Sequence, residues 1–252
     1  MEFDENIKLT EDEFNYNTIN TSLFTINDVN GDNACMYRSL ANYIYYATPH
    51  DDLLSLKRFK KWGEIKDIET VSTKFGYYSE EQDELARFIQ KLILHHIKLN
   101  ADTLIEPINM KIRDCIPLFH DMEYHEYISV YTLFAGEHKD NVSDKNKDKL
   151  LYDRWGSILE LTVFSNIVCT SVIIFNSQIY NKRTNKINTG KITNSKPQKD
   201  VRLKIFQIIN KKYLYDKLPI FLIWKKHHNY GHFMVCYPNN HNTILEDLSN
   251  YL

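Results

Sequence analysis

The chain has 252 residues, which is enough for one large domain or one domain with extensions. Its 31 Lys and Arg residues almost balance 33 Asp and Glu residues, and the net charge of −2 gives no electrostatic reason to expect nucleic-acid binding. Hydrophobic residues make up 43% of the sequence, enough to build a buried core. No apolar run approaches the ~20 residues that span a bilayer, so we expect no membrane insertion.

The cysteines and the N-terminus point to a reducing compartment. No C-x-x-C pair is present, and widely separated cysteines in a chain of this size do not indicate a disulfide framework. The first six residues are acidic and lack the apolar segment of a signal peptide. We therefore expect a cytoplasmic location in which free thiols persist and react. The four cysteines are Cys35, Cys115, Cys169 and Cys236.

The first part of the chain predicts helices. Residues 1–27 are polar and are interpreted as an N-terminal extension. A turn rich in Gly, Asp and Asn then leads into a helix that begins at or near Cys35. A second helix is predicted over 79–99, opened by a capping box of Ser79 and Gln82. A third lies within 119–134. The stripe after Cys35 has helical spacing and consists of Met36, Leu40, Tyr43 and Ile44.

The last third of the chain predicts mainly strands. Ser157 and Glu160 form a second capping box, which opens one more helix. Residues 136–149 are a charged loop, and residues 176–200 are polar, which predicts an exposed loop or hairpin tip. Helices followed by strands favour an α+β fold over an alternating parallel sheet. The predicted strands are 172–175, 204–209, 219–224 and 233–237.

Cys35 is the first candidate for a reactive residue. It lies where the turn meets the helix, and the partial positive charge of a helix N-terminus stabilises a thiolate, the reactive form of cysteine. The N–H groups of a first helical turn lack helical partners and are able to bind a developing oxyanion. The alternative is that Cys35 is simply a small buried apolar residue.

His232 is the matching candidate for a general base. It follows Gly231 at the start of an apolar strand, and a strand end holds a side chain rigidly. His227 and His228 lie in the preceding loop and are interpreted as solvated. His228 and His232 have the four-residue spacing of a helical zinc pair, but the glycine indicates a turn, so we predict no metal.

Four segments occur together in an order typical of one known family. They are 31–40 (GDNACMYRSL), 84–100 (a helix), 155–161 (WGSILEL) and 231–235 (GHFMV). The first resembles the catalytic-cysteine motif of the ovarian-tumour (OTU) family of deubiquitinases, and the last resembles its catalytic-histidine motif. The second and third are similar to the helix and the W-G-x-x-x-E-L segment between them. The resemblance covers about 28–237.

This resemblance implies a papain-like domain over 28–237, with helices packed on a small central, mostly antiparallel sheet, followed by a tail at 238–252. It implies hydrolysis of isopeptide or peptide bonds after the C-terminus of ubiquitin or a ubiquitin-like modifier. Cys35 would be the nucleophile and His232 the general base, with the backbone of Asn33 and Cys35 as the oxyanion hole. Expected partners are ubiquitin and polyubiquitin chains, bound by a monomer without cofactor or metal.

The sequence departs from the family pattern at Met234, where many members carry the Asp or Asn that orients the histidine. Methionine is a poor acceptor for that hydrogen bond. Asp32 is the best replacement, although it is also a typical turn former. Asn229 and Asn240 are further options. Two other functions remain open: a module that binds ubiquitin without cutting it, and a related cysteine hydrolase that cuts other peptides.

Overall fold

The computed structural model combines helices with one large sheet. It describes residues 18–31, 34–48, 59, 80–106, 108–132, 156–181, 186–188, 201–214, 217–227, 230–240, 243, 244, 246 and 248. In chain order the elements are β1 (Thr18–Asn20), η1 (Thr21–Leu23), β2 (Phe24–Asn27), α2 (Cys35–Ala47), α4 (Glu80–Leu99), β3 (Leu104–Ile105), β4 (Met110–Lys111), α5 (Ile112–His120), α6 (Tyr124–Thr132), α8 (Ile158–Val168), β5 (Val172–Asn181), β6 (Lys186–Asn188), β7 (Val201–Ile209), η3 (Lys211–Tyr213), β8 (Ile220–His227) and β9 (Tyr230–Pro238).

The main sheet has the order β1-β7-β5-β8-β9-β2, and β6 pairs with β5 beside this path. The pairing of β5 with β8 is parallel, and the other pairings of this sheet are antiparallel. The described part of the chain thus confirms the predicted α+β class. The sheet is larger than the small one expected, and its parallel pairing makes it mixed.

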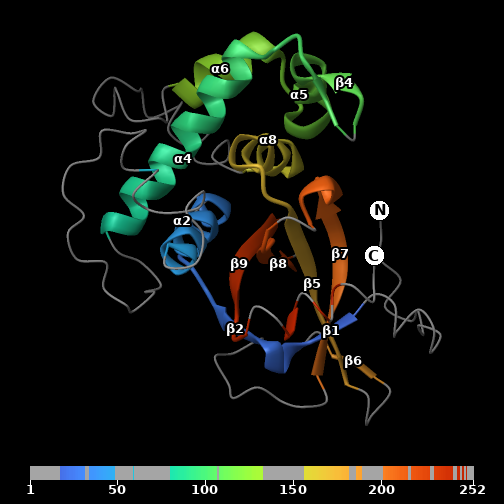
Figure 1. The fold of residues 1–252 in the computed structure, drawn as a ribbon. Coiled ribbons are helices and arrows are strands. Elements are labelled where there is room, and N and C mark those ends of the chain that lie inside the picture. The colour runs from blue at the N-terminus through green and yellow to red at the C-terminus, as the bar shows by residue number, and fades with distance from the viewer. Residues whose placement is uncertain are drawn as a thin grey trace.

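The two edges of this sheet lie close together, because consecutive strands occupy them. Strand β1 pairs with β7 at one edge and β2 pairs with β9 at the other. Only four residue steps separate Asn20 from Phe24, a reach of at most about 14 Å. Six strands laid flat would place their edges about 24 Å apart. The sheet therefore curls, as Figure 1 shows, and the β1–η1–β2 segment joins its edges.

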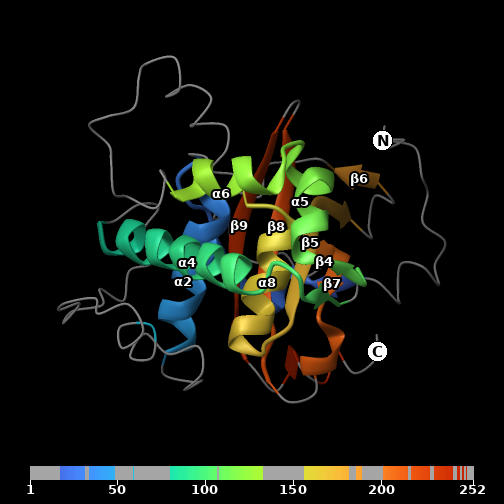
Figure 2. The ribbon, with the colours of Figure 1, turned by 90° about the horizontal axis from the view of Figure 1, so that it is seen from above.

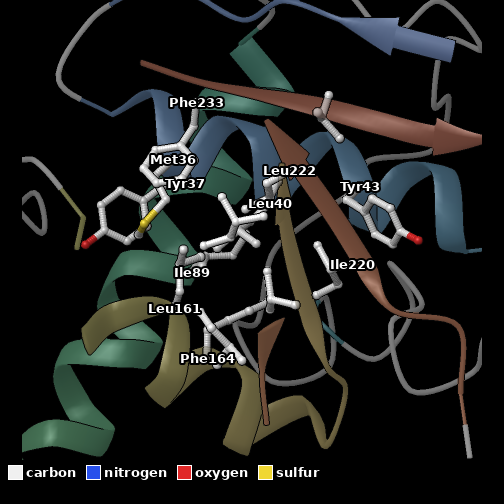
Figure 3. Close-up of a cluster of buried hydrophobic side chains, with 14 of the residues drawn as sticks. Met36, Tyr37, Leu40, Tyr43, Ile89, Leu161, Phe164, Ile220, Leu222 and Phe233 are labelled. Carbon is white, nitrogen blue, oxygen red and sulfur yellow. The ribbon is translucent and has the colours of Figure 1, made fainter. Parts of the chain in front are cut away.

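Both faces of the central strands are buried. Residues 172–175 of β5 and 220–223 of β8 are all fully buried, which explains why both read as continuous apolar runs. On one face Phe24 of β2 packs edge-on against Phe175 and Phe221, at ring-centroid distances of 5.4 and 5.1 Å. The other face carries Ile220 and Leu222, which Figure 3 shows among apolar side chains of α2, α4 and α8.

The helices form a layer over the sheet, seen from above in Figure 2. Helix α2 lies against β9 and β8, and two tyrosine hydroxyls anchor it. Tyr43 donates to the carbonyl of Pro219 at 2.6 Å, and Tyr46 donates to that of Pro238 at 2.5 Å. Helix α4 packs on α2, and α5 and α6 lie beyond it. The start of α2 is thus held beside the free end of β9.

The observed boundaries differ from the predicted ones in three places. The single helix expected within 119–134 is two helices, α5 and α6, separated by Asp121 in the left-handed conformation. Strand β5 continues to Asn181 and pairs with β6, so the polar 176–200 segment begins as a hairpin. Residues 18–27, predicted as part of an extension, form β1, η1 and β2. The 136–149 loop lies outside the described residues.

Candidate active site

Cys35 is the first residue of α2, where the sequence predicted it. The preceding N-cap residue, Ala34, has no side-chain oxygen with which to cap the helix. The first N–H groups of α2 are therefore not taken by an N-cap side chain, and they lie where the helix dipole favours negative charge. Cys35 is 6% exposed, so its sulfur is mostly shielded from water.

The sulfur of Cys35 accepts a hydrogen bond from the backbone N–H of Phe233 at 3.4 Å, across 198 positions of sequence. This contact follows from how β2 ends. Strand β2 pairs with β9 only as far as Asn27, opposite Val235. The chain then turns away into α2, and the N–H of Phe233 lies beyond the last β2 pairing. Cys35 meets the edge of β9 at that point. An N–H donor there stabilises a sulfur that carries negative charge.

His232 lies beside Cys35 and binds an aspartate. Its Nε2 is 2.6 Å from Oδ1 of Asp28, the residue that follows β2. The same oxygen accepts the backbone N–H of Val29 at 2.9 Å, which fixes the carboxylate. The His232 side chain is 13% exposed and that of Asp28 is 46% exposed. Since Nε2 is occupied, Nδ1 is the ring nitrogen left for the thiol.

Electrostatics favour the charged form of His232. Burial acts to lower its pKa, but hydrogen bonds and charges from Asp28 and Cys35 outweigh burial and raise the pKa to about 9. Burial likewise acts to raise the pKa of Asp28, and the bond and charge of His232 reverse this and hold that pKa below its usual value. Lys225, opposite His232 on β8, adds to that effect. The three side chains thus form an ion-paired cluster at neutral pH.

The structure describes only part of the predicted site. Asp32, Asn33 and Asn229 lie outside the described residues. Asn240 lies beyond the far end of β9, about 20 Å of strand from His232, and its Oδ1 accepts the N–H of Thr243.

Met234 is 1% exposed and faces the core, so it is not a partner of His232. Sequence reasoning missed Asp28, because residues 24–27 were not predicted as a strand. Pairing that strand with β9 would have indicated it.

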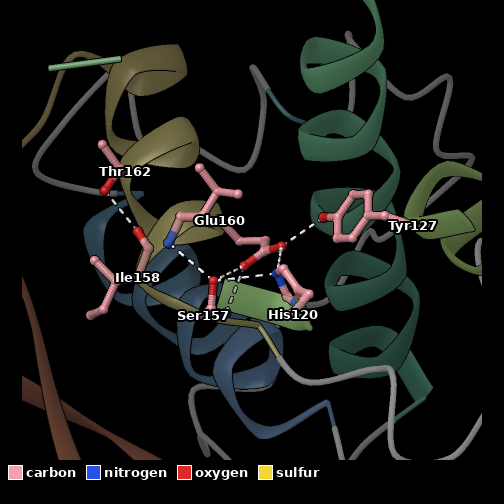
Figure 4. A network of polar contacts seen from close by, with 7 residues as sticks. His120, Tyr127, Ser157, Ile158, Glu160 and Thr162 are labelled. Atoms are coloured by element: carbon pink, nitrogen blue, oxygen red, sulfur yellow. Dashed lines mark hydrogen bonds and ion pairs between the residues drawn. The ribbon is translucent and has the colours of Figure 1, made fainter. Parts of the chain in front are cut away.

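A second polar cluster supports the helices behind Cys35 (Figure 4). The fully buried carboxylate of Glu160 accepts bonds from the Ser157 N–H at 2.7 Å and from the Tyr127 hydroxyl at 2.6 Å. His120 Nε2 lies 2.7 Å from its other side-chain contact, Oε1 of Glu160. The predicted capping box of Ser157 and Glu160 is confirmed. The cluster therefore ties α5, α6 and α8 together.

This cluster reaches the candidate nucleophile through Gly156, which precedes Ser157. A Cβ added at Gly156 would collide with the thioether of Met36 and touch the ring of Tyr37, the two residues after Cys35. The Tyr37 hydroxyl is buried, and burial together with the charge of Glu160 raises its pKa well above the usual value. The close approach explains the glycine and fixes the start of α8 against that of α2. Trp155 lies outside the described residues.

Comparisons with known proteins gave one structural likeness to report. No family model matches the chain, and no curated protein matches it. Among solved structures, the chain is similar to the viral OTU domain protease from Taggert virus, with a TM-score of 0.40 and 13% sequence identity. The alignment covers 88% of this chain and 86% of that one. Among the described helices, none has the length and apolar character needed to cross a membrane.

Proposed function

We propose that this protein is a cysteine hydrolase that cleaves isopeptide or peptide bonds after the C-terminus of ubiquitin or a ubiquitin-like modifier. The observation that carries the proposal is the convergence on Cys35 of a charged His232 and the N–H of Phe233. A thiolate beside an imidazolium is the reactive state of a cysteine nucleophile. The motif resemblance to OTU deubiquitinases supports the choice of substrate.

In the proposed reaction, the thiolate of Cys35 attacks the scissile carbonyl carbon and forms a C–S bond. Backbone N–H groups at the start of α2, including that of Cys35, stabilise the oxyanion. His232 gives its proton to the leaving nitrogen as the C–N bond breaks. Water then attacks the thioester, His232 accepts a proton from it, and the carboxylate product leaves with the thiolate restored. Asn33 keeps its proposed place as a second oxyanion donor.

Asp28 is the proposed positioning residue for His232. Its bond to Nε2 holds the ring with Nδ1 toward the thiol and stabilises the imidazolium, the two roles that an orienting acid has in such sites. Asp32, proposed from the motif, is adjacent to the oxyanion donors. The non-cutting alternative was based on Met234, and an acid at Asp28 removes that support.

The proposal is tested with purified protein and di-ubiquitin of defined linkages. We expect cleavage of at least one linkage, its loss in Cys35→Ala, and labelling of Cys35 by a ubiquitin bearing a C-terminal electrophile. Cys169→Ala is the matched control, since Cys169 is an exposed free thiol, and it retains both activities. Absence of cleavage and of labelling across ubiquitin and ubiquitin-like substrates overturns the proposal.

A further inference from the structure

An exposed aromatic pair lies one residue from the candidate site. Phe206 of β7 is 44% exposed, and its ring stacks on that of Trp224 of β8 at a centroid distance of 5.7 Å and an interplanar angle of 21°. Trp224 is half-buried, packed against the core on its inner side. Exposed aromatic rings supported from behind are typical contact residues for a bound polypeptide.

Trp224 is joined directly to the residues of the site. It is the cross-strand partner of Phe233, whose N–H binds the Cys35 sulfur. Its indole nitrogen lies over Gly231, where a Cβ would collide with it, and Gly231 precedes His232. Directly opposed residues of an antiparallel pair lie about 5 Å apart, so the backbone of Trp224 is about 10 Å from the sulfur.

The face of the sheet tells which arm of a substrate meets this pair. Trp224 shares a face with Leu222 and Phe233, which Figure 3 shows toward the helices, whereas His232 and Lys225 alternate onto the other face. The leaving nitrogen must meet the His232 ring to receive its proton. The acyl arm therefore runs on the side of Trp224 and Phe206.

We propose that Trp224 and Phe206 determine specificity by binding an apolar side chain on the acyl arm of the substrate. This inference rests on the proposed function. An extended chain advances about 3.3 Å per residue, so the ring of Trp224 meets a residue about three positions before the scissile bond, and Phe206 one to two positions further. The preferred substrate thus carries a Leu-like side chain at the third to fifth position before the cleaved bond.

The test uses substrates that have an acyl arm only. Two matched peptides ending in Gly-Gly-aminocoumarin carry either Leu or Asp at the third to fifth positions before the scissile bond. We expect the wild type to prefer the Leu peptide, and Trp224→Ala and Phe206→Ala to lower kcat/KM for it about tenfold, mainly through KM, with little change for the Asp peptide. Trp224→Phe, which keeps a ring, retains most of the preference.

Leu118→Ala is the matched control, because Leu118 is 67% exposed on α5, and it leaves the preference unchanged. Phe206→Ala keeps the test sharp if Trp224→Ala unfolds, since Phe206 lies on the surface. Alkylation of Cys35 by iodoacetamide separates the two proposals. A wild type that cuts neither peptide nor protein substrate, with an unreactive Cys35, overturns both. A reactive, cutting enzyme whose Leu preference survives both alanine variants overturns only this inference.

Discussion

Arg38 and Asp83 form an ion pair between the helix that carries Cys35 and the next helix of the chain, with Nη2 of Arg38 2.6 Å from Oδ1 of Asp83. The Arg38 side chain is 4% exposed, so its charge is removed from water and depends on this partner. Asp83 also pairs with Arg87 at 2.7 Å, but that arginine is 38% exposed. The two arginines thus share one carboxylate at very different depths.

Replacing each arginine in turn separates the buried bond from the surface one. Arg38→Met keeps the apolar stem and is expected to lower the free energy of unfolding by about 1.5–3 kcal/mol, because a charged hydrogen bond between α2 and α4 is lost. Arg87→Met is expected to cost about 0.5 kcal/mol or less, as other exposed pairs within a helix do. Urea unfolding measures both. Equal losses would contradict the difference in burial.

Asp28→Asn is expected to lower kcat/KM by about 10- to 100-fold, the effect of losing one charged orienting bond. It also moves the upper limb of the pH–rate profile to lower pH, because the carboxylate stabilises the imidazolium and raises the pKa of His232 to about 9. The profile, with NMR titration of His232, measures both. An Asp28→Asn enzyme with an unshifted upper limb assigns the orienting role elsewhere, with Asp32→Asn the next variant to compare.

Glu160→Gln is expected to cost about 3 kcal/mol of stability at pH 7, because a buried charged network loses its centre. Burial acts to raise the pKa of Glu160, but the charge and bonds of His120, with those of Ser157 and Tyr127, lower it to about 2. The carboxylate therefore stabilises the fold above its unfolded value of about 4.5, and this is lost as pH falls toward 2.

The gap between wild type and Glu160→Gln is thus expected to narrow between pH 5 and pH 2, in chemical unfolding measured across that range. Glu106→Gln is the control, since Glu106 is 73% exposed in its pair with Lys212 and is expected to change stability little at any pH. A gap that stays constant down to pH 2 would mean that Glu160 is not ionised in the folded state.

Gly156→Ala is expected to lower the unfolding free energy by about 1–3 kcal/mol, because the new methyl group displaces the buried Met36 side chain beside Cys35. Gly31→Ala is the matched control: nothing lies within 4 Å of a Cβ at that position. Thermal unfolding of the two variants compares them. A Gly31→Ala protein as destabilised as Gly156→Ala would point to backbone freedom rather than close packing.

Local patterns predicted the elements on either side of the site, but not how they meet. Periodicity and turn chemistry indicated the helix at Cys35 and the capping box at Ser157, since both depend on residues within one or two turns. The strand at 24–27 was not predicted, because it is short and lies in a polar segment. Its pairing with β9 is set by tertiary contacts, and that pairing brings Asp28 to His232.

The same reason explains the other differences. The parallel pairing of β5 with β8 depends on contacts between strands that are separated by β7 in the chain, which no short pattern records. The division of 119–134 depends on Asp121 adopting a left-handed conformation, which aspartate tolerates but does not require. The capping box proposed for Ser79 lies outside the described residues, and Gln82 binds Asn42 of α2 at 2.8 Å.

The pairing of β2 with β9 has a consequence for how activity arises during synthesis. Asp28 and Cys35 emerge from the ribosome early, whereas His232 and Phe233 emerge about 200 residues later. A growing chain therefore carries its thiol for most of its translation without the groups proposed to activate it. Contacts between such distant segments also form late and slowly in folding. The order of the chain itself thus delays the appearance of a reactive thiol until the sheet is nearly complete.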